Sequence, residues 1–220
     1  MKSFTYLCFL AGLVVLSGAG LTRAEDSAPG PATTPVLSQF SPANLKKLLA
    51  GEAVFEPVAT KGPDGKDEGH GRGAVLIQRP VEECFRIFLD FDRQYLYFPK
   101  MTVSRVLERK GNRVRMYKEL DFMVTVVKYT HILTIVPEDH RVDFITDPEG
   151  ENSFKLSAGF FRFEKVDEKT SLIFYEMTRL EMGFKIPGFI KTYLSSKDLP
   201  KIVINIKKRI ESGGTWVKGK

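Results

Sequence analysis

The stretch from Asp198 to Gly213 has the clearest helical pattern in the chain. Its apolar residues recur at spacings of three and four, which places them on one face of a helix: Leu199, Ile202, Val203, Ile206 and Ile210. Asp198 can cap the first turn, Pro200 is tolerated there, and Gly213 is suited to end the helix. Because so apolar a stripe must be buried, we expect this helix to pack against another layer.

Most of the chain between Gly51 and Met182 has the pattern of strands separated by polar turns. Lys110-Gly111-Asn112 is a hairpin signal, and the polar, glycine-rich stretch from Lys61 to Gly71 predicts a loop. Strands are expected at 53–58, 73–78, 103–109, 113–122, 124–136, 141–146, 154–164 and 171–182.

Two short helices are also predicted. Ser41 and Pro42 open the first, whose apolar side is Leu45, Leu48 and Leu49. Pro80 starts the second, whose apolar face is Val81, Cys84, Phe85 and Phe88, and an aromatic, turn-rich segment from Asp90 to Pro99 follows it. The order predicts an α+β fold in which one curved antiparallel sheet wraps around the long C-terminal helix, with short helices after the early strands.

The N-terminus has the composition of an export signal. Lys2 precedes an apolar stretch, Phe4 to Leu16, and small residues lead to Ala24. We expect a signal peptide at 1–24, a flexible linker at 25–37, one domain at 38–216 and a basic tail at 217–220. Cleavage after Ala19 is an alternative, as is an uncleaved anchor. Cleavage near Ala24 predicts an exported, periplasmic or secreted protein.

Composition narrows the partners. The chain has 220 residues, 43% of them hydrophobic, with 17 phenylalanines and a formal net charge of +6. Because the basic residues form no long run, we expect no nucleic-acid partner. We also expect the protein to be a monomer. Cleavage of the signal peptide would remove Cys8 and leave Cys84 without a disulfide partner. Cys84 lies on an apolar helical face, which favours its role as a small buried hydrophobic residue.

The candidate catalytic groups are scattered. His70, His131 and His140 lack the spacing of metal ligands, so we predict neither a metal site nor a cofactor. His131 alternates with Tyr129 and Leu133 and could be a polar group of a pocket, although a satisfied or partly exposed strand histidine is the better interpretation.

Three carboxylates receive a structural interpretation. Asp90 and Asp92 fit a role in stabilising a turn. Glu176 could pair with Arg179 or Lys118 if buried, but a solvent-facing residue is the better interpretation. No catalytic residue is therefore predicted.

Four stretches together resemble the START/SRPBCC superfamily, and most of all its polyketide cyclase/dehydrase and coenzyme Q-binding branch. They are RPVEECFRIFLDFDRQYLYFPK (79–100), RVLERKGNRV (105–114), LSAGFFRFEK (156–165) and LPKIVINIKKRIE (199–211). Gln94-Tyr95-Leu96-Tyr97 departs from the branch, where a proline often follows. The resemblance implies a helix-grip fold with an apolar pocket between the sheet and the last helix. Members of the superfamily bind lipids, quinones, sterols or polyketides, and some are enzymes.

We therefore expect this protein to bind or carry a hydrophobic small molecule, such as a lipid or a quinone or other isoprenoid-like ligand, without chemistry. A cyclase- or hydrolase-type enzyme and a protein-interaction module are the alternatives. The basic face of the last helix could also contact an anionic membrane surface transiently. The candidate pocket-lining residues are Phe85, Phe88, Tyr117, Phe122, Phe144, Phe160, Tyr175, Ile202, Val203 and Ile206.

Overall fold

The computed structural model describes residues 36–61, 67–153, 155–181 and 199–219, all within the compact unit Thr33–Lys220. The side chains of residues 57–70 and of Leu199 are outside this description. The expected signal peptide, nearly all of the expected linker, and the capping residue Asp198 also lie outside the described residues. Among the helices that are described, none is long and apolar enough to cross a membrane.

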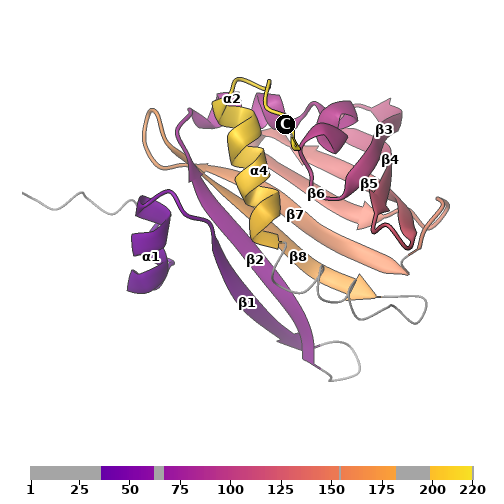
Figure 1. Cartoon of the computed structure of the whole chain (residues 1–220), viewed down its shortest axis with the longest axis horizontal. Coiled ribbons are helices and arrows are strands. Elements are labelled where there is room, and N and C mark those ends of the chain that lie inside the picture. The colour runs from indigo at the N-terminus through magenta and orange to yellow at the C-terminus, as the bar shows by residue number, and fades with distance from the viewer. Residues whose placement is uncertain (1–35, 62–66, 154, 182–198, 220) are drawn as a thin grey trace, which may run out of the picture. The chain divides into compact units, whose positions relative to one another are not determined.

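One antiparallel sheet of eight strands dominates the described part of the chain (Figure 1). Its spatial order is β1-β2-β8-β7-β6-β5-β4-β3, so β2 and β8 join the first hairpin to the later meander. The strands are β1 (Val54–Lys61), β2 (Asp67–Ile77), β3 (Met101–Lys110), β4 (Arg113–Asp121), β5 (Val126–Val136), β6 (Arg141–Thr146), β7 (Leu156–Lys165) and β8 (Ser171–Glu181).

Few helices accompany the sheet in the residues that the structure describes. They are α1 (Pro42–Leu49), α2 (Val81–Phe88), the 3₁₀ turns η1 (Phe91–Leu96) and η2 (Pro137–Asp139), and α4 (Leu199–Glu211). Figure 1 shows α4 crossing one face of the sheet, where it contacts β1, β2, β8 and α2. This arrangement confirms the predicted α+β helix-grip fold.

The apolar stripe of α4 is buried as predicted. Val203 and Ile206 are fully buried, Ile210 is 1% exposed, and Ile202 is partly buried against the same core. The helix ends as expected, because Gly213 and Gly214 adopt positive φ angles and their N–H groups bond to the carbonyls of Ile210 and Arg209.

The sheet buries side chains on both faces. The face toward α2 and α4 carries the large cluster, which includes Phe88, Phe161 and Val203. The opposite face carries a smaller cluster around α1, in which the rings of Phe40 and Phe174 stack at 5.8 Å. Because side chains alternate along a strand, neighbouring residues such as Phe174 and Tyr175 serve different clusters.

The first helix follows its sequence signals at the start. Ser41 Oγ accepts the N–H of Asn44 at 3.3 Å, and Pro42 occupies the first turn. Leu48 is fully buried and Leu45 is partly buried, but Leu49 is 60% exposed, so the predicted apolar side is wrong for Leu49. A helix this short turns only a narrow stripe toward the sheet.

The first hairpin is longer than predicted. The expected loop from Lys61 to Gly71 is wrong at both ends, since β1 reaches Lys61 and β2 begins at Asp67. His70 therefore lies in a strand, where its backbone is registered with Val58. Backbone pairing between the two strands overrides the weak strand propensity of the glycines. The hairpin at Gly111 is confirmed, because this residue has φ +55° between β3 and β4.

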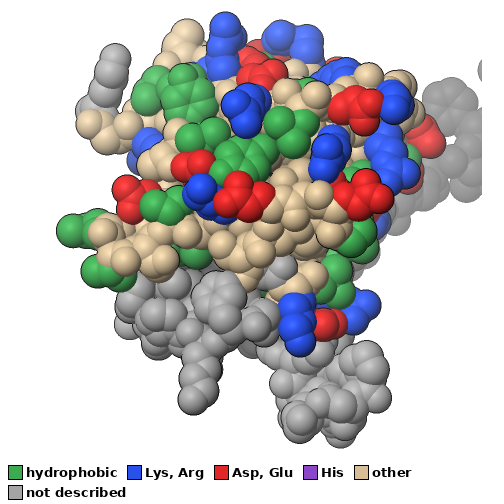
Figure 2. Space-filling view, turned by 90° about the vertical axis from the view of Figure 1, so that its right-hand side faces the viewer, with side chains coloured by type: hydrophobic (Ala, Val, Ile, Leu, Met, Phe, Trp, Pro, Cys, Tyr) green, Lys and Arg blue, Asp and Glu red, His purple; other side chains and the backbone are tan. Residues whose placement is uncertain are grey.

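The edge strand β3 is protected by charge. Arg105, Glu108, Arg109 and Lys110 are exposed along it, and charged residues on an edge strand disfavour pairing with another chain. Figure 2 shows that basic and acidic side chains are interspersed on this side of the molecule.

Candidate functional site

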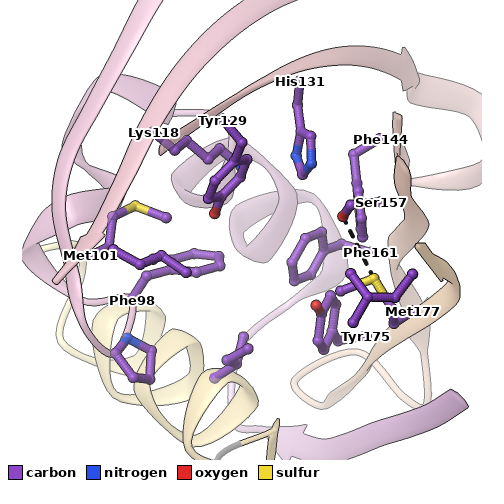
Figure 3. Close-up of a pocket in the computed structure, with 14 residues that line it drawn as sticks. Phe98, Met101, Lys118, Tyr129, His131, Phe144, Ser157, Phe161, Tyr175 and Met177 are labelled. Atoms are coloured by element: carbon purple, nitrogen blue, oxygen red, sulfur yellow. Dashed lines mark hydrogen bonds between the residues drawn. The ribbon is translucent and has the colours of Figure 1, made fainter. Parts of the chain in front are cut away.

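An apolar cavity lies between the inner face of the sheet and the start of α4. Its volume is about 70 Å³. Residues of strands β4 to β8 and Ile202 of α4 line it. The segment from Phe98 to Met101 closes one side (Figure 3). The lining residues are Phe98, Pro99, Met101, Lys118, Leu120, Tyr129, His131, Phe144, Ser157, Phe161, Tyr175, Met177, Leu180 and Ile202.

The alternation of side chains along the strands directs the polar lining residues toward the cavity. In β4, burial alternates strictly, and Val114, Met116, Lys118 and Leu120 are the buried set. Lys118 pairs in register with Tyr129 of β5, and His131 lies two residues further along the same face. Cross-strand and diagonal neighbours of this kind are within reach of each other's side chains.

Lys118 places an amine in this apolar environment. Its side chain is 5% exposed, and the Nζ atom lies 6.0 Å from the centroid of the Tyr129 ring. No carboxylate in the described residues lies within ion-pair distance of this amine. Burial disfavours the charged form and lowers the pKa of Lys118 to about 7. At neutral pH the amine therefore exists in both protonation states.

His131 is buried beside it without a hydrogen-bond partner. The side chain is 5% exposed, and within the described part of the chain neither Nδ1 nor Nε2 has a hydrogen-bond partner. Figure 3 shows both ring nitrogens directed toward the cavity. Burial lowers the pKa of His131 well below its usual value, and the nearby Lys118 lowers it further. The ring is thus neutral at pH 7 and presents one donor and one acceptor.

Hydroxyl groups complete the polar part of the lining. The Tyr129 and Tyr175 rings carry theirs into the space that Figure 3 displays. Ser157 Oγ lies 3.7 Å from the sulfur of Met177, to which it donates a weak hydrogen bond. Burial raises the pKa of Tyr175, so this group remains a neutral hydroxyl. These groups can donate hydrogen bonds to a ligand at several points of an otherwise apolar surface.

The C-terminus holds the Phe98–Met101 wall in place. Lys218 Nζ donates to the carbonyl oxygens of Phe98 and Met101, and Asn205 of α4 donates to the carbonyl oxygen of Tyr97 at 2.8 Å. Lys218, expected in a basic tail, is thus an internal donor. Partial burial lowers its pKa to about 8.

The predicted lining residues separate into three groups. Phe144, Tyr175 and Ile202 line the cavity. Phe85, Phe88, Phe122, Val203 and Ile206 belong to the solid part of the same core. Tyr117 and Phe160 point to the other face of the sheet, where Tyr117 bonds Glu119 at 2.6 Å and Phe160 packs under Arg141. The sequence-based assignment of these two is corrected by strand parity, since their inward neighbours are Lys118 and Phe161.

Sequence reasoning offered His131 as a pocket residue only as the less favoured alternative, and it missed Lys118 as a lining residue. The interpretation of His131 as a satisfied or partly exposed residue is wrong, because it is buried and unpartnered. A signal for Lys118 was present in the alternation of β4, where Val114, Met116 and Leu120 fix the buried parity. A lysine that alternates along one strand with three buried apolar residues lies on the same face as they do, so its side chain points inward.

The other candidate groups have structural roles. Glu176 pairs with Arg72 at 2.8 Å on the outer face, so neither Arg179 nor Lys118 is its partner. Asp92 Oδ1 accepts the N–H of Val106 in β3 at 2.7 Å, so its role is structural, but it joins η1 to the edge strand and does not form the expected local turn. Cys84 is buried, which raises its thiol pKa to about 11 and confirms its apolar role. The described residues contain no cluster of three or more groups that could hold a metal ion.

Part of the basic surface of α4 is engaged within the molecule. Lys207 donates to the carbonyl oxygen of Leu76 at 2.8 Å and pairs with Glu211. Arg209 is buried and donates to the carbonyl oxygen of Trp216 at 2.8 Å. Lys201 and Lys208 remain on the exposed side.

Solved structures share this fold. A STAR-related lipid transfer protein from Xanthomonas axonopodis superposes with a TM-score of 0.59 at 13% identity, covering 72% of this chain and 93% of the other. A START superfamily protein from Mycobacterium smegmatis gives 0.55 at 14% identity, covering 65% and 97%. The di-domain ARO/CYC protein StfQ from the steffimycin biosynthetic pathway gives 0.50 at 13% identity, covering 64% and 44%.

These likenesses establish the fold alone. No family sequence model matches the chain, and no curated protein matches it in sequence. The chain has the helix-grip fold of START/SRPBCC proteins, a fold that accommodates both lipid transfer proteins and aromatase/cyclases.

Proposed function

We propose that this START-like chain binds a hydrophobic small molecule, such as a lipid or another isoprenoid-like compound, in the cavity between the sheet and α4. The observation that carries the proposal is the cavity itself: an aromatic and aliphatic lining sits where the packed core could have continued. Empty apolar space costs stability, and a ligand that fills it would restore the lost contacts. The lipid transfer protein among the structural neighbours supports the same function.

The cavity volume constrains how a ligand enters. At about 70 Å³ it is well below the range of roughly 300–1,000 Å³ that is typical of ligand pockets. A bulky ligand therefore requires side chains of the lining to move. Met101 and Met177 face the cavity, and the flexible, unbranched methionine side chain is suited to such adjustment.

The direct test is to identify what the protein carries. Native mass spectrometry and solvent extraction of the purified full chain should release a hydrophobic small molecule, and the delipidated protein should bind the neutral dye Nile red. Ile202→Trp places a larger ring at the cavity and should reduce dye binding at least tenfold. Ile145→Trp is the matched control, because Ile145 is 47% exposed on the outer face of β6. Dye binding that is unchanged in Ile202→Trp, or absent from the delipidated wild type, would contradict the proposal.

A cyclase-type enzyme is the second candidate, and one observation favours it. Lys118 and His131 face the same cavity, and burial brings the pKa of Lys118 to about 7, a value suited to general acid–base catalysis. Binding is the better-supported function because both groups are bases, and no described residue forms a hydrogen bond that would orient the His131 ring or an ion pair that would hold the Lys118 amine. Conversion of a poly-β-ketone substrate by wild-type protein, lost in Lys118→Met, would decide in favour of the enzyme.

A further inference from the structure

The cavity lining has an imbalance of charge. The lining residues that the structure describes include Lys118 and no aspartate or glutamate. Tyr129 and His131 of β5 lie beside Lys118, and Tyr175 of β8, the Phe98–Met101 wall and Ile202 of α4 line the same cavity; none of these side chains carries a negative charge. A buried ammonium without a counterion is unfavourable, whereas one that is paired and hydrogen-bonded is stable.

The other polar groups are arranged to donate. His131 supplies one N–H, and Tyr129, Tyr175 and Ser157 supply hydroxyls that can turn toward a ligand. Because neither nitrogen of His131 has a hydrogen-bond partner among the described residues and the ring is 5% exposed, the site has unmet hydrogen-bonding capacity within an apolar wall. A ligand with acceptor oxygens would meet that capacity, and a pure hydrocarbon would leave it unmet.

From this charge imbalance we infer that the ligand carries a single anionic oxygen group, a carboxylate, on an apolar body, and that Lys118 and His131 bind that group. The inference rests on the proposed function and specifies its ligand class. The carboxylate supplies the counterion that the lining lacks, while the apolar body lies against residues such as Phe161, Met177 and Ile202. Hydrogen bonds to charged groups are about twice as strong as neutral ones, so the head group determines the choice of ligand.

Matched ligands provide the test. Dodecanoic acid and 1-dodecanol share one chain and differ in the head group, and each can displace Nile red from the delipidated full chain at pH 8. The acid should bind at least about tenfold more tightly than the alcohol. In Lys118→Met this preference should disappear, with the alcohol affinity unchanged within about twofold. Lys128→Met is the control, since Lys128 pairs with Glu151 outside the cavity, and it should keep the preference.

Proton uptake is an independent readout on the wild type alone. At pH 8 the empty protein holds Lys118 mostly as the neutral amine, because its pKa is about 7. A bound carboxylate raises that pKa, so binding should take up close to one proton. Calorimetry in two buffers of different ionisation enthalpy measures this uptake, which 1-dodecanol should not produce.

The outcomes separate the two proposals. Binding of alcohol and acid with equal affinity, or a preference that survives in Lys118→Met, would refute the carboxylate inference while leaving hydrophobic binding intact. Failure of Nile red and both amphiphiles to bind would overturn both proposals. Acid binding without proton uptake would place the carboxylate away from Lys118 and overturn the assignment of this residue.

Discussion

Two regions of the same inner core show opposite ways of burying side chains. In the packed region, defined by Phe88, Phe91, Phe163, Val203 and Ile206, the side chains are at most 2% exposed, and Phe88 contacts three other rings. In the cavity region, defined by Lys118, His131, Tyr175 and Ile202, an amine and an imidazole are buried beside empty space.

The difference between these regions has a physical meaning. The packed region has the enclosed side chains and ring contacts of a core that stabilises the fold. The cavity region forgoes packing contacts and buries polar groups whose hydrogen bonds are unmet, and both features lower stability. Features that cost stability without a structural return are typical of binding and catalytic sites. The comparison therefore supports the proposal that ligand binding takes place at one end of a continuous core.

The largest expected effect tests the packed region. Phe88→Ala should lower the free energy of unfolding by about 3–5 kcal/mol, because a fully enclosed ring leaves a cavity that its neighbours cannot fill. Ile202→Ala should cost roughly 1 kcal/mol, since Ile202 already borders empty space and is only partly buried. Urea denaturation of both variants measures the difference. Equal losses would mean that the two regions are packed alike.

Lys118→Met should have the next largest effect, and it should be stabilising. The folded pKa of about 7 lies below the ordinary lysine value of 10.5. Between these values the unfolded chain binds a proton that the folded chain does not, so wild-type stability falls as the pH decreases from about 10.5 to about 7 and then levels off with respect to this group. At pH 7 the variant should gain roughly 2–4 kcal/mol, less than the upper limit set by the full shift.

The measurement for Lys118 is a pair of urea titrations at pH 7 and pH 10. The advantage of Lys118→Met over wild type should shrink at the higher pH, where the wild-type amine is neutral in the folded state and partly neutral in the unfolded chain. Lys128→Met, on the outer side of the same strand pair, should change stability by less than about 1 kcal/mol. A loss of stability in Lys118→Met at pH 7 would mean that the buried amine has a stabilising partner.

The fold could be predicted because its signals were local and redundant. The apolar stripe of α4 predicts a helix packed on the sheet, and the turn at Gly111 predicts a hairpin. Strands that follow one another along the chain usually pair, so few spatial orders remain for the strands between these two signals. The lining of the cavity depends instead on which alternate residues of each strand face inward. A shift of one residue in the strand pairing would move every side chain of that strand to the other face. In β4 the parity was readable from Val114 and Met116.

In β7 and β8 parity was harder to predict because both faces are apolar. Phe160 and Phe161 serve opposite faces, as do Phe174 and Tyr175. The empty space at the cavity is a property of packing among residues far apart in the chain, and no local pattern encodes it.

The third prediction concerns the stability of the protein at acidic pH. Because the pKa of His131 is lowered by burial, the unfolded chain binds a proton below about pH 6.5 that the folded chain rejects, and stability decreases as the pH falls below that value. The contribution of this one group is about 1.4 kcal/mol per pH unit until the folded ring titrates. His131→Phe should remove this component, which urea midpoints at pH 7 and pH 5 would reveal. An unchanged difference between the two pH values would show that His131 is not buried as a neutral ring.

The smallest expected effect tests whether charge is handled differently on the outer face. Arg72 and Glu176 form an ion pair at 2.8 Å there, with side chains 31% and 13% exposed, and the guanidinium also lies 5.6 Å from the centroid of the Phe174 ring. Partly exposed pairs contribute little, so Arg72→Met should cost about 1 kcal/mol, most of it from leaving the Glu176 carboxylate without a partner. Adding Glu176→Gln should recover much of that loss, because the uncompensated charge is then removed. A double-mutant cycle at low and high salt measures the coupling, which salt should weaken.

Whereas Lys118→Met improves stability by removing a charge that has no partner, Arg72→Met reduces it by removing one that does. If Arg72→Met also stabilised the protein, the outer pair would be as uncompensated as the inner amine, and the contrast that supports the proposed binding site would lose its basis.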